Sequence, residues 1–203
     1  MITILIVIST AIISIVSFQR SDLFSKLAFE PFLIQEKKQY FRFITHSFVH
    51  ADWIHLIVNM LVFFSFGNYV ESQLGSIQGS SSVFSGGIIF VLLYFGGTVI
   101  ASLPTYFKHK NNPNYVSVGA SGAVSAVLFT SIFLAPLEKV YFYGILPVPG
   151  IIFGGLYLIY SSYMARKGND NINHDAHFWG AVYGFIFPIL VEPSLLKNFF
   201  NQF

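Results

Sequence analysis

The chain has 203 residues, of which 54% are hydrophobic, 18% aromatic and only 10% charged. Soluble domains usually carry about 25% charged residues, so this composition excludes an ordinary soluble protein and indicates an integral membrane protein. The absence of cysteine excludes disulfides, thiolate metal sites and a cysteine nucleophile. The net charge of +2 gives no indication of a nucleic-acid partner.

Six apolar segments are long enough to cross a bilayer, for which about 20 mostly apolar residues are needed. The first segment lacks the basic start and the cleavage site of a signal peptide, so we interpret it as a retained span. The sequence predicts a single all-α transmembrane domain over residues 1–203, with spans at 2–18, 53–70, 84–106, 118–135, 141–164 and 177–196.

The segment between the first two spans, residues 19–52, is the most polar part of the chain, yet its charges alternate with aromatic and aliphatic residues. We expect a folded loop that is partly embedded in the membrane surface. Nine of the eleven Lys and Arg residues lie in the loops after the first, third and fifth spans. Because positive charge favours the cytoplasmic side, this count alone places those three loops in the cytoplasm.

Polar residues near the starts of three spans indicate a functional site. The second, fourth and sixth spans enter the membrane from the same face, since each follows an odd-numbered loop. The second span carries His55 and Asn59, the fourth carries Ser121, and the sixth carries His177. Polar residues inside a bilayer are costly and tend to mark functional sites. We therefore expect these four side chains to converge at similar, shallow depth.

Small residues on two of these spans favour close packing. Gly180 and Gly184 follow His177 at i+3 and i+7, on the same helix face, and Gly119 and Gly122 flank Ser121. Stripes of small residues let two helix backbones approach closely in a membrane. If these stripes pack together, the Ser121 hydroxyl comes within hydrogen-bond reach of the His177 imidazole.

A serine beside a histidine is the nucleophile and general-base pairing of serine hydrolases. The backbone N–H of Ser121, near a helix start, is suited to hold the oxyanion that forms during acyl transfer. His55 and Asn59 are further donors, stacked at i and i+4 on one face of the second span. The sequence therefore predicts Ser121 and His177 as catalytic residues, with Ser121, His55 and Asn59 around the oxyanion.

The motifs that carry these residues resemble those of a known family, the rhomboid intramembrane serine proteases. "VGASGAV" is similar to the family's Gly-x-Ser-Gly segment around Ser121, and "AHFWGAVYG" to its Ala-His-x-x-Gly-x-x-x-Gly segment around His177. "HADWIHLIVNMLVFFSFGNYVESQLGS" resembles its second span, with the His-x-x-x-Asn pair at His55 and Asn59. The four elements occur in order on the expected spans.

The resemblance implies a six-helix core that cleaves transmembrane segments of membrane-anchored proteins through an acyl-enzyme, with a Ser–His dyad, no third acid and no cofactor. It implies that Arg42, in "YFRF", anchors the first loop and that Glu71, in "VESQLGS", supports the structure. Its expected partners are transmembrane protein substrates and the lipid bilayer. It also implies that the site opens to the non-cytoplasmic side, which we expect to be that of a bacterial plasma membrane. This orientation opposes the charge count, but a folded first loop need not obey a rule derived from simple loops.

The same residues allow other interpretations. His174 and His177 are three residues apart, and His46, His50 and His55 lie in the other half of the chain, which raises the possibility of a zinc site. The histidine-bearing segments contain no Glu, as a metalloprotease motif requires, so we expect no metal. A transporter should show broken spans and charges at mid-membrane depth, and a scaffold would use the polar residues only to join helices.

Overall fold

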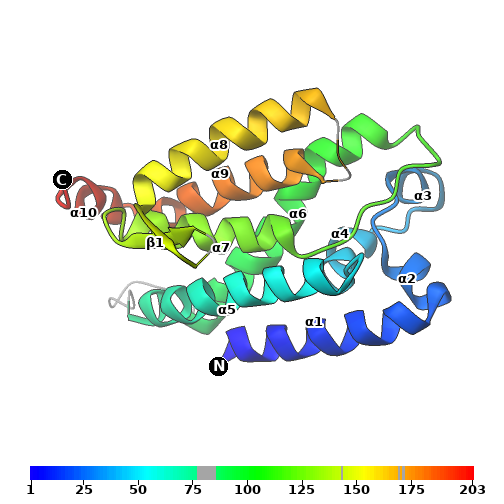
Figure 1. Ribbon diagram of the computed structural model, residues 1–203, viewed down its shortest axis with the longest axis horizontal. Coiled ribbons are helices and arrows are strands. Elements are labelled where there is room, and N and C mark those ends of the chain that lie inside the picture. The colour runs from blue at the N-terminus through cyan, green and yellow to red at the C-terminus, as the bar shows by residue number, and fades with distance from the viewer. Residues whose placement is uncertain (77–85, 143, 169, 171) are drawn as a thin grey trace.

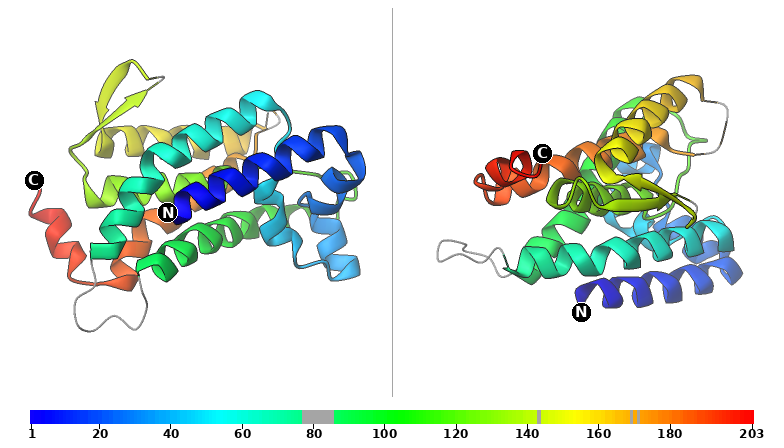
Figure 2. Two further views of the ribbon diagram at one scale, coloured as in Figure 1. Left: turned by 90° about the horizontal axis from the view of Figure 1, so that it is seen from below. Right: turned by 60° about the vertical axis from the view of Figure 1, so that its left-hand side comes forward.

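The computed structural model describes residues 1–76, 86–142, 144–168, 170 and 172–203. In this part of the chain, long helices form a bundle around one central helix, α7, as Figures 1 and 2 show. The long helices are α1 (Ile2–Gln19), α5 (Trp53–Ser76), α6 (Gly86–His109), α7 (Ser121–Leu134), α8 (Gly150–Lys167) and α9 (His174–Val191).

Helix α7 is buried along nearly its whole length, which places it at the core of the bundle. Helices α5, α7 and α9 all begin at the end of the bundle that carries the first-loop helices (Figure 1). Three helices, α1, α5 and α6, are long and apolar enough to cross a membrane. The all-α membrane fold is therefore confirmed, whereas crossing by all six helices stays a prediction.

The first loop is folded, with four short helices gathered at one end of the bundle (Figure 2). They are α2 (Ser21–Leu27), α3 (Pro31–Lys37), α4 (Arg42–Thr45) and the 3-10 turn η1 (His46–Phe48). Arg42 is buried between them and donates to the carbonyl oxygens of Ser25 and Ala28 and to the Glu30 carboxylate, at 2.8, 2.5 and 3.1 Å. This one guanidinium therefore ties three parts of the loop together.

The expected start of the fifth span, 141–164, is wrong, because α8 begins at Gly150. The preceding residues form an antiparallel hairpin of β1 (Lys139–Phe142) and β2 (Leu146–Pro149), with Lys139 opposite Pro149. Pro147 has no N–H for a helical hydrogen bond, and Gly144 has a φ of +72°. Apolarity alone could not distinguish this hairpin from a helix.

Other boundaries shift by less. The fourth helix spans 121–134 and not 118–135, and the second continues to Ser76. The sixth begins at His174, three residues before the expected start, because the Asn173 side chain accepts a hydrogen bond from the Ala176 N–H and caps it. Residues 84 and 85 of the expected third span lie outside the described residues. The chain ends with α10 (Leu195–Phe200).

Helices α7 and α9 are in backbone contact at two glycines. A Cβ atom at Gly180 would overlap the Gly122 carbonyl oxygen, and one at Gly184 would overlap the Ala126 carbonyl oxygen. The Gly184 carbonyl oxygen also accepts a hydrogen bond from the Thr130 hydroxyl at 2.7 Å. No larger residue fits at either glycine without separating the two helices.

Candidate active site

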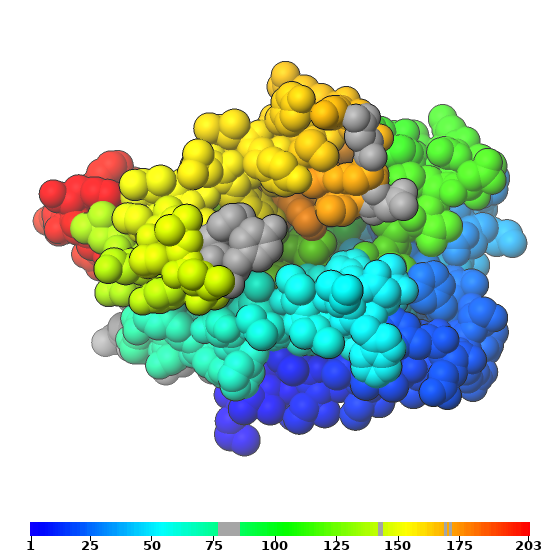
Figure 3. Space-filling model, viewed as in Figure 1, coloured from blue at the N-terminus to red at the C-terminus, as the bar shows by residue number. Residues whose placement is uncertain are grey.

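Helix α7 is short, and Ser121 is its first residue. At about 1.5 Å per residue, 14 residues extend about 21 Å, well under the roughly 30 Å of a hydrocarbon core. A crossing of the membrane at α7 would therefore include irregular chain at an end of the helix. In Figure 3, green side chains lie in a hollow between α5 (cyan) and α9 (orange), where α7 runs in Figure 1.

The chain that leads into Ser121 is irregular but fully anchored. Ser117 exchanges backbone hydrogen bonds with Phe29, at 3.1 and 2.9 Å. The Gly119 N–H donates to the His46 carbonyl oxygen at 3.0 Å, and the Ala120 N–H donates to His50 Nε2 at 3.3 Å. Irregular backbone at membrane depth is tolerated only where protein satisfies its polar groups, and here the first loop does so.

The backbone after Ala120 has free donors. The first helical bond of α7 runs from the Val124 N–H to the Ala120 carbonyl oxygen, at 2.9 Å. The N–H groups of Ser121, Gly122 and Ala123 therefore have no hydrogen-bond partner among the described residues. A helix start with free N–H groups attracts negative charge, because the helix dipole adds to the donors.

Ser121 and His177 lie on the two sides of the α7–α9 contact. Ser121 precedes Gly122, whose carbonyl oxygen faces Gly180, and Ala176, the neighbour of His177, packs on Gly122. Both side chains are half-buried, and neither has a hydrogen-bond partner within the described residues. Within the described residues, the structure therefore leaves a hydroxyl and an imidazole unpaired on two helices that are in backbone contact.

The other two predicted oxyanion donors lie on α5. The His55 ring packs on Gly119, where a Cβ atom would lie 2.7 Å from His55 Nε2 and φ is +114°. His55 Nδ1 accepts from the Ala51 N–H at 3.5 Å, so Nε2 carries the proton of the neutral ring and faces the Ser121 loop. Asn59 is buried one turn further along and donates to the His55 carbonyl oxygen at 2.8 Å.

Tyr157 of α8 is a site residue that the sequence analysis missed. Its ring stacks on His177, with centroids 6.3 Å apart and planes 25° apart, and its hydroxyl lies 2.6 Å from the Ser125 hydroxyl of α7. Ser125 lies four residues after Ser121, so it occupies the same face of α7. The available signal in the sequence was Ser125, because a hydroxyl on an apolar helix calls for a hydrogen-bond partner.

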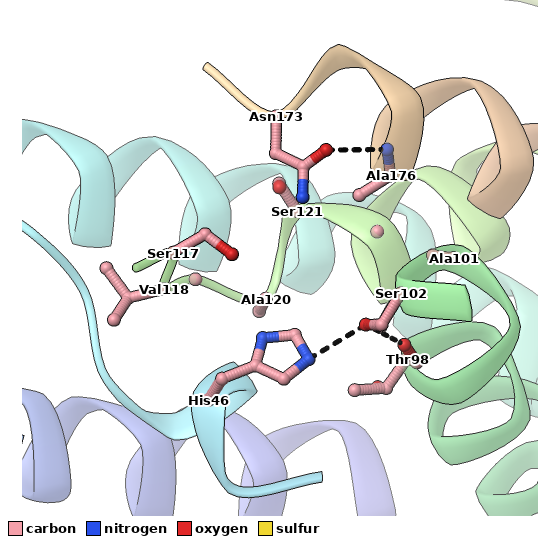
Figure 4. Close-up of a pocket in the computed structure, with 13 residues that line it drawn as sticks. His46, Thr98, Ala101, Ser102, Ser117, Val118, Ala120, Ser121, Asn173 and Ala176 are labelled. Atoms are coloured by element: carbon pink, nitrogen blue, oxygen red, sulfur yellow. Dashed lines mark hydrogen bonds between the residues drawn. The ribbon is translucent and has the colours of Figure 1, made fainter. Parts of the chain in front are cut away.

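A small cavity lies behind Ser121, as Figure 4 shows. Its volume is about 20 Å³, which is enough for about one water molecule. The cavity is lined by polar groups, among them Ser121, Asn173 and His46, and His46 Nε2 lies 3.0 Å from the Ser102 hydroxyl. A water held here would be next to the Ser121 side chain.

Two acidic residues, Glu71 and Asp175, have structural partners. Glu71 accepts hydrogen bonds from the backbone N–H groups of Ile2 and Thr3 and from the Thr3 hydroxyl, and it pairs with the Met1 amino group. It therefore caps the start of α1. Asp175 forms an ion pair with Lys108 of α6, at 3.1 Å. Among the described residues, no three His, Cys, Asp or Glu side chains are grouped as a metal site would need.

Comparison with known proteins identifies the class to which this fold and site belong. Residues 37–194 match the Rhomboid domain family, and this match covers most of the chain. The chain therefore belongs to the rhomboid family of multi-pass membrane proteins.

Individual relatives match about 70% of this chain. RHOMBOID-like protein 12, mitochondrial, of Arabidopsis thaliana is 30% identical over 143 residues, which are 68% of this chain and 42% of the relative. Presenilin-associated rhomboid-like protein A, mitochondrial, of Danio rerio is 31% identical over 147 residues, 70% and 35% of the two chains. YdcA of Bacillus subtilis (strain 168) is 29% identical over 152 residues, 75% and 67%.

The chain thus matches less than half of each of the two relatives named as mitochondrial. Because these names place relatives in mitochondria, the matches do not support the expectation of a bacterial plasma membrane in particular. They do support an integral membrane protein with several helices in the bilayer.

The anchor at His50 generates a prediction about pH. Nε2 accepts from Ala120, so Nδ1 carries the proton and donates to the Ser14 hydroxyl at 2.9 Å. Burial, together with the neighbouring His55 and His46, lowers the pKa of His50 to about 3, and burial lowers that of His46 to about 4. An unperturbed histidine has a pKa of about 6.5. Between that pH and about pH 4, both rings are therefore neutral in the folded protein, whereas they are protonated in the unfolded chain.

We expect the thermal midpoint in detergent to be steady above pH 7 and to fall from pH 6.5 towards pH 4, because the unfolded chain then binds protons that the folded one does not. Each histidine contributes at most about 1.4 kcal/mol per pH unit. The H50Q variant should be less stable at pH 7.5 but show a flatter pH dependence. If the thermal midpoint fell equally steeply with pH in H50Q and in the wild type, the role of His50 as a neutral anchor would be contradicted.

Proposed function

We propose that this rhomboid-family protein is an intramembrane serine endopeptidase that cleaves transmembrane segments of other membrane proteins. The observation that supports the proposal is the backbone contact of α7 and α9 at Gly122 and Gly180, because Gly122 follows Ser121 directly and Gly180 lies one turn after His177 on α9. Family membership supports the reaction class.

In the proposed mechanism, His177 takes the hydroxyl proton as Ser121 Oγ attacks a peptide carbonyl carbon. The tetrahedral intermediate collapses when His177 gives that proton to the leaving amine, and an acyl-enzyme remains. Water then attacks the ester carbonyl with His177 again as base, which releases the new carboxylate and restores Ser121.

The proposed oxyanion site is the start of α7. The Ser121 N–H has no partner among the described residues, and the helix dipole of α7 favours negative charge at this end. His55 Nε2, held against Gly119, is a second donor, and the free Asn59 amide N–H is a third. Losing one such donor typically costs about 100- to 1,000-fold in rate.

The depth of Ser121 favours substrates that lie in the bilayer. A peptide bond reaches the start of α7 from the membrane side only if a transmembrane segment enters between helices and unwinds, since a helical backbone has no free carbonyl carbon to offer. The exposed outer faces of α5 and α8, including Ile57, Leu61, Leu156 and Ile159, are suited to contact lipid or such a segment.

The dyad is tested with a fluorophosphonate probe on the purified protein in detergent. We expect labelling of the wild type and a loss of at least about 100-fold in the labelling rate for both S121A and H177A, because either change removes the activated nucleophile. S131A is the matched control, since that hydroxyl donates to its own helix at Leu128 and should label like the wild type. Equal labelling of all four proteins would overturn the proposal.

We also propose that the end of the bundle carrying the first loop and the start of α7 faces away from the cytoplasm. Because the chain has no cysteine, an introduced cysteine is the only thiol in it. Its reactivity then shows on which side of the membrane that position lies. We expect E36C in α3 to react with a membrane-impermeant maleimide on intact spheroplasts, and Q202C, near the other end of the bundle, to react only after permeabilisation. The reverse pattern would support the charge count.

A further inference from the structure

Asp170 and His174 form a pair that the proposed reaction does not use. His174 Nε2 lies 3.1 Å from both carboxylate oxygens of Asp170, whose Oδ1 also accepts from the Ile172 N–H at 3.2 Å. The His174 side chain is only 3% exposed, and that of Asp170 is 31% exposed. The pair therefore joins a carboxylate at the surface to an imidazole in the interior.

The buried ring points towards the base. The His174 and His177 rings meet edge to face, with centroids 5.7 Å apart and planes 76° apart, one helical turn from each other on α9. On the other side Tyr160 of α8 contacts His174 in the same manner, at 5.7 Å. The first turn of α9 is held further by Asn173, which accepts from the Ala176 N–H and the Thr105 hydroxyl. The position of His174 is therefore fixed by Tyr160 on α8, by Asp170 before α9 and by the capped first turn of α9 itself.

One atom of His174 has no structural explanation. Its Nδ1 is buried and has no hydrogen-bond partner among the described residues. A buried polar atom without a partner loses its hydrogen bonds to water and gains none in return. An apolar side chain would fill the same space without that cost, so packing alone does not account for a histidine here.

We propose that Asp170 and His174 are positioning residues for His177, which fix its ring and favour its protonated form during catalysis. The inference rests on the proposed function. While His174 is neutral, its Nε2–H donates to Asp170, and the carboxylate charge lies behind a ring that touches the base. When His177 takes the proton of Ser121, the imidazolium forms in the field of that carboxylate, which stabilises it.

The proposed role requires that Asp170 carry its negative charge. The hydrogen bond from His174 lowers the pKa of the Asp170 carboxyl, so the carboxylate keeps its charge at neutral and mildly acidic pH. Other titratable groups around the two rings are Tyr160 and Tyr157 on α8 and His55 on α5. Asp175, the nearer acid in sequence, is already paired with Lys108. Among these groups, Asp170 is the acid that binds His174, and the His174 ring contacts the His177 ring.

The test is the pH dependence of fluorophosphonate labelling of the full-length protein in detergent, from pH 5 to pH 9. D170N keeps an oxygen for His174 but removes the charge, and H174F keeps an aromatic ring but removes the link. We expect both variants to label several-fold more slowly at the plateau. We also expect the midpoint of the acidic limb to shift down by about half a pH unit, since the imidazolium loses its counter-charge.

The double variant D170N/H174F should shift no further than either single variant, because the two residues act as one unit. D175N is the matched control, since it removes a carboxylate from the same helix turn and should leave the midpoint unchanged. A merely structural role would lower the fraction of active protein and so the rate at every pH, without moving the midpoint.

The outcomes separate this inference from the proposed function. Ser121-dependent labelling with wild-type midpoints in D170N and H174F would overturn the role of the pair and leave the proposed function intact. An equal shift in D175N would also overturn it, because any charge at the start of α9 would then suffice. Absence of Ser121-dependent labelling in the wild type would overturn both.

Discussion

The structure depends on the contact between the backbones of α7 and α9. Gly180 faces the Gly122 carbonyl oxygen and Gly184 faces the Ala126 carbonyl oxygen, with no space for a Cβ atom at either place. In lipid there is little hydrophobic gain when two helices meet, so close packing and interhelical hydrogen bonds must hold them. The same contact that stabilises the bundle core also sets the positions of Ser121 and His177, so stability and the proposed chemistry share one cause.

A second constraint follows from the length of α7. A 14-residue helix is too short to cross the bilayer on its own, so a crossing at α7 would include the irregular chain before it. The first loop provides hydrogen-bond partners for the backbone of that chain. These partners are the backbone of Phe29, the His46 carbonyl oxygen and the His50 ring. This explains why a membrane protein carries a folded polar segment held by a buried arginine. The loop supplies hydrogen bonds that lipid does not.

The sequence predicted the family through its motifs and the membrane class through its apolar segments, because both are properties of the chain itself. It did not predict the hairpin at 139–149, since apolarity does not separate a strand pair from a helix end. Nor did it find Tyr157 or the Asp170–His174 pair, because their relation to His177 depends on how α8 and the start of α9 pack. Local sequence patterns predict which residues share a helix face. Contacts between helices that are distant in the sequence become known only from the three-dimensional structure.

The most direct test of the account is the rate constant for fluorophosphonate labelling of Ser121 in the G180A variant. The added methyl group must push α9 away from the Gly122 carbonyl oxygen, so the account predicts a loss of at least tenfold relative to the wild type. G155A is the reference, since a Cβ atom on that glycine of α8 meets nothing within 4 Å. A G180A rate equal to that of G155A and the wild type would contradict the claim that this contact assembles the site.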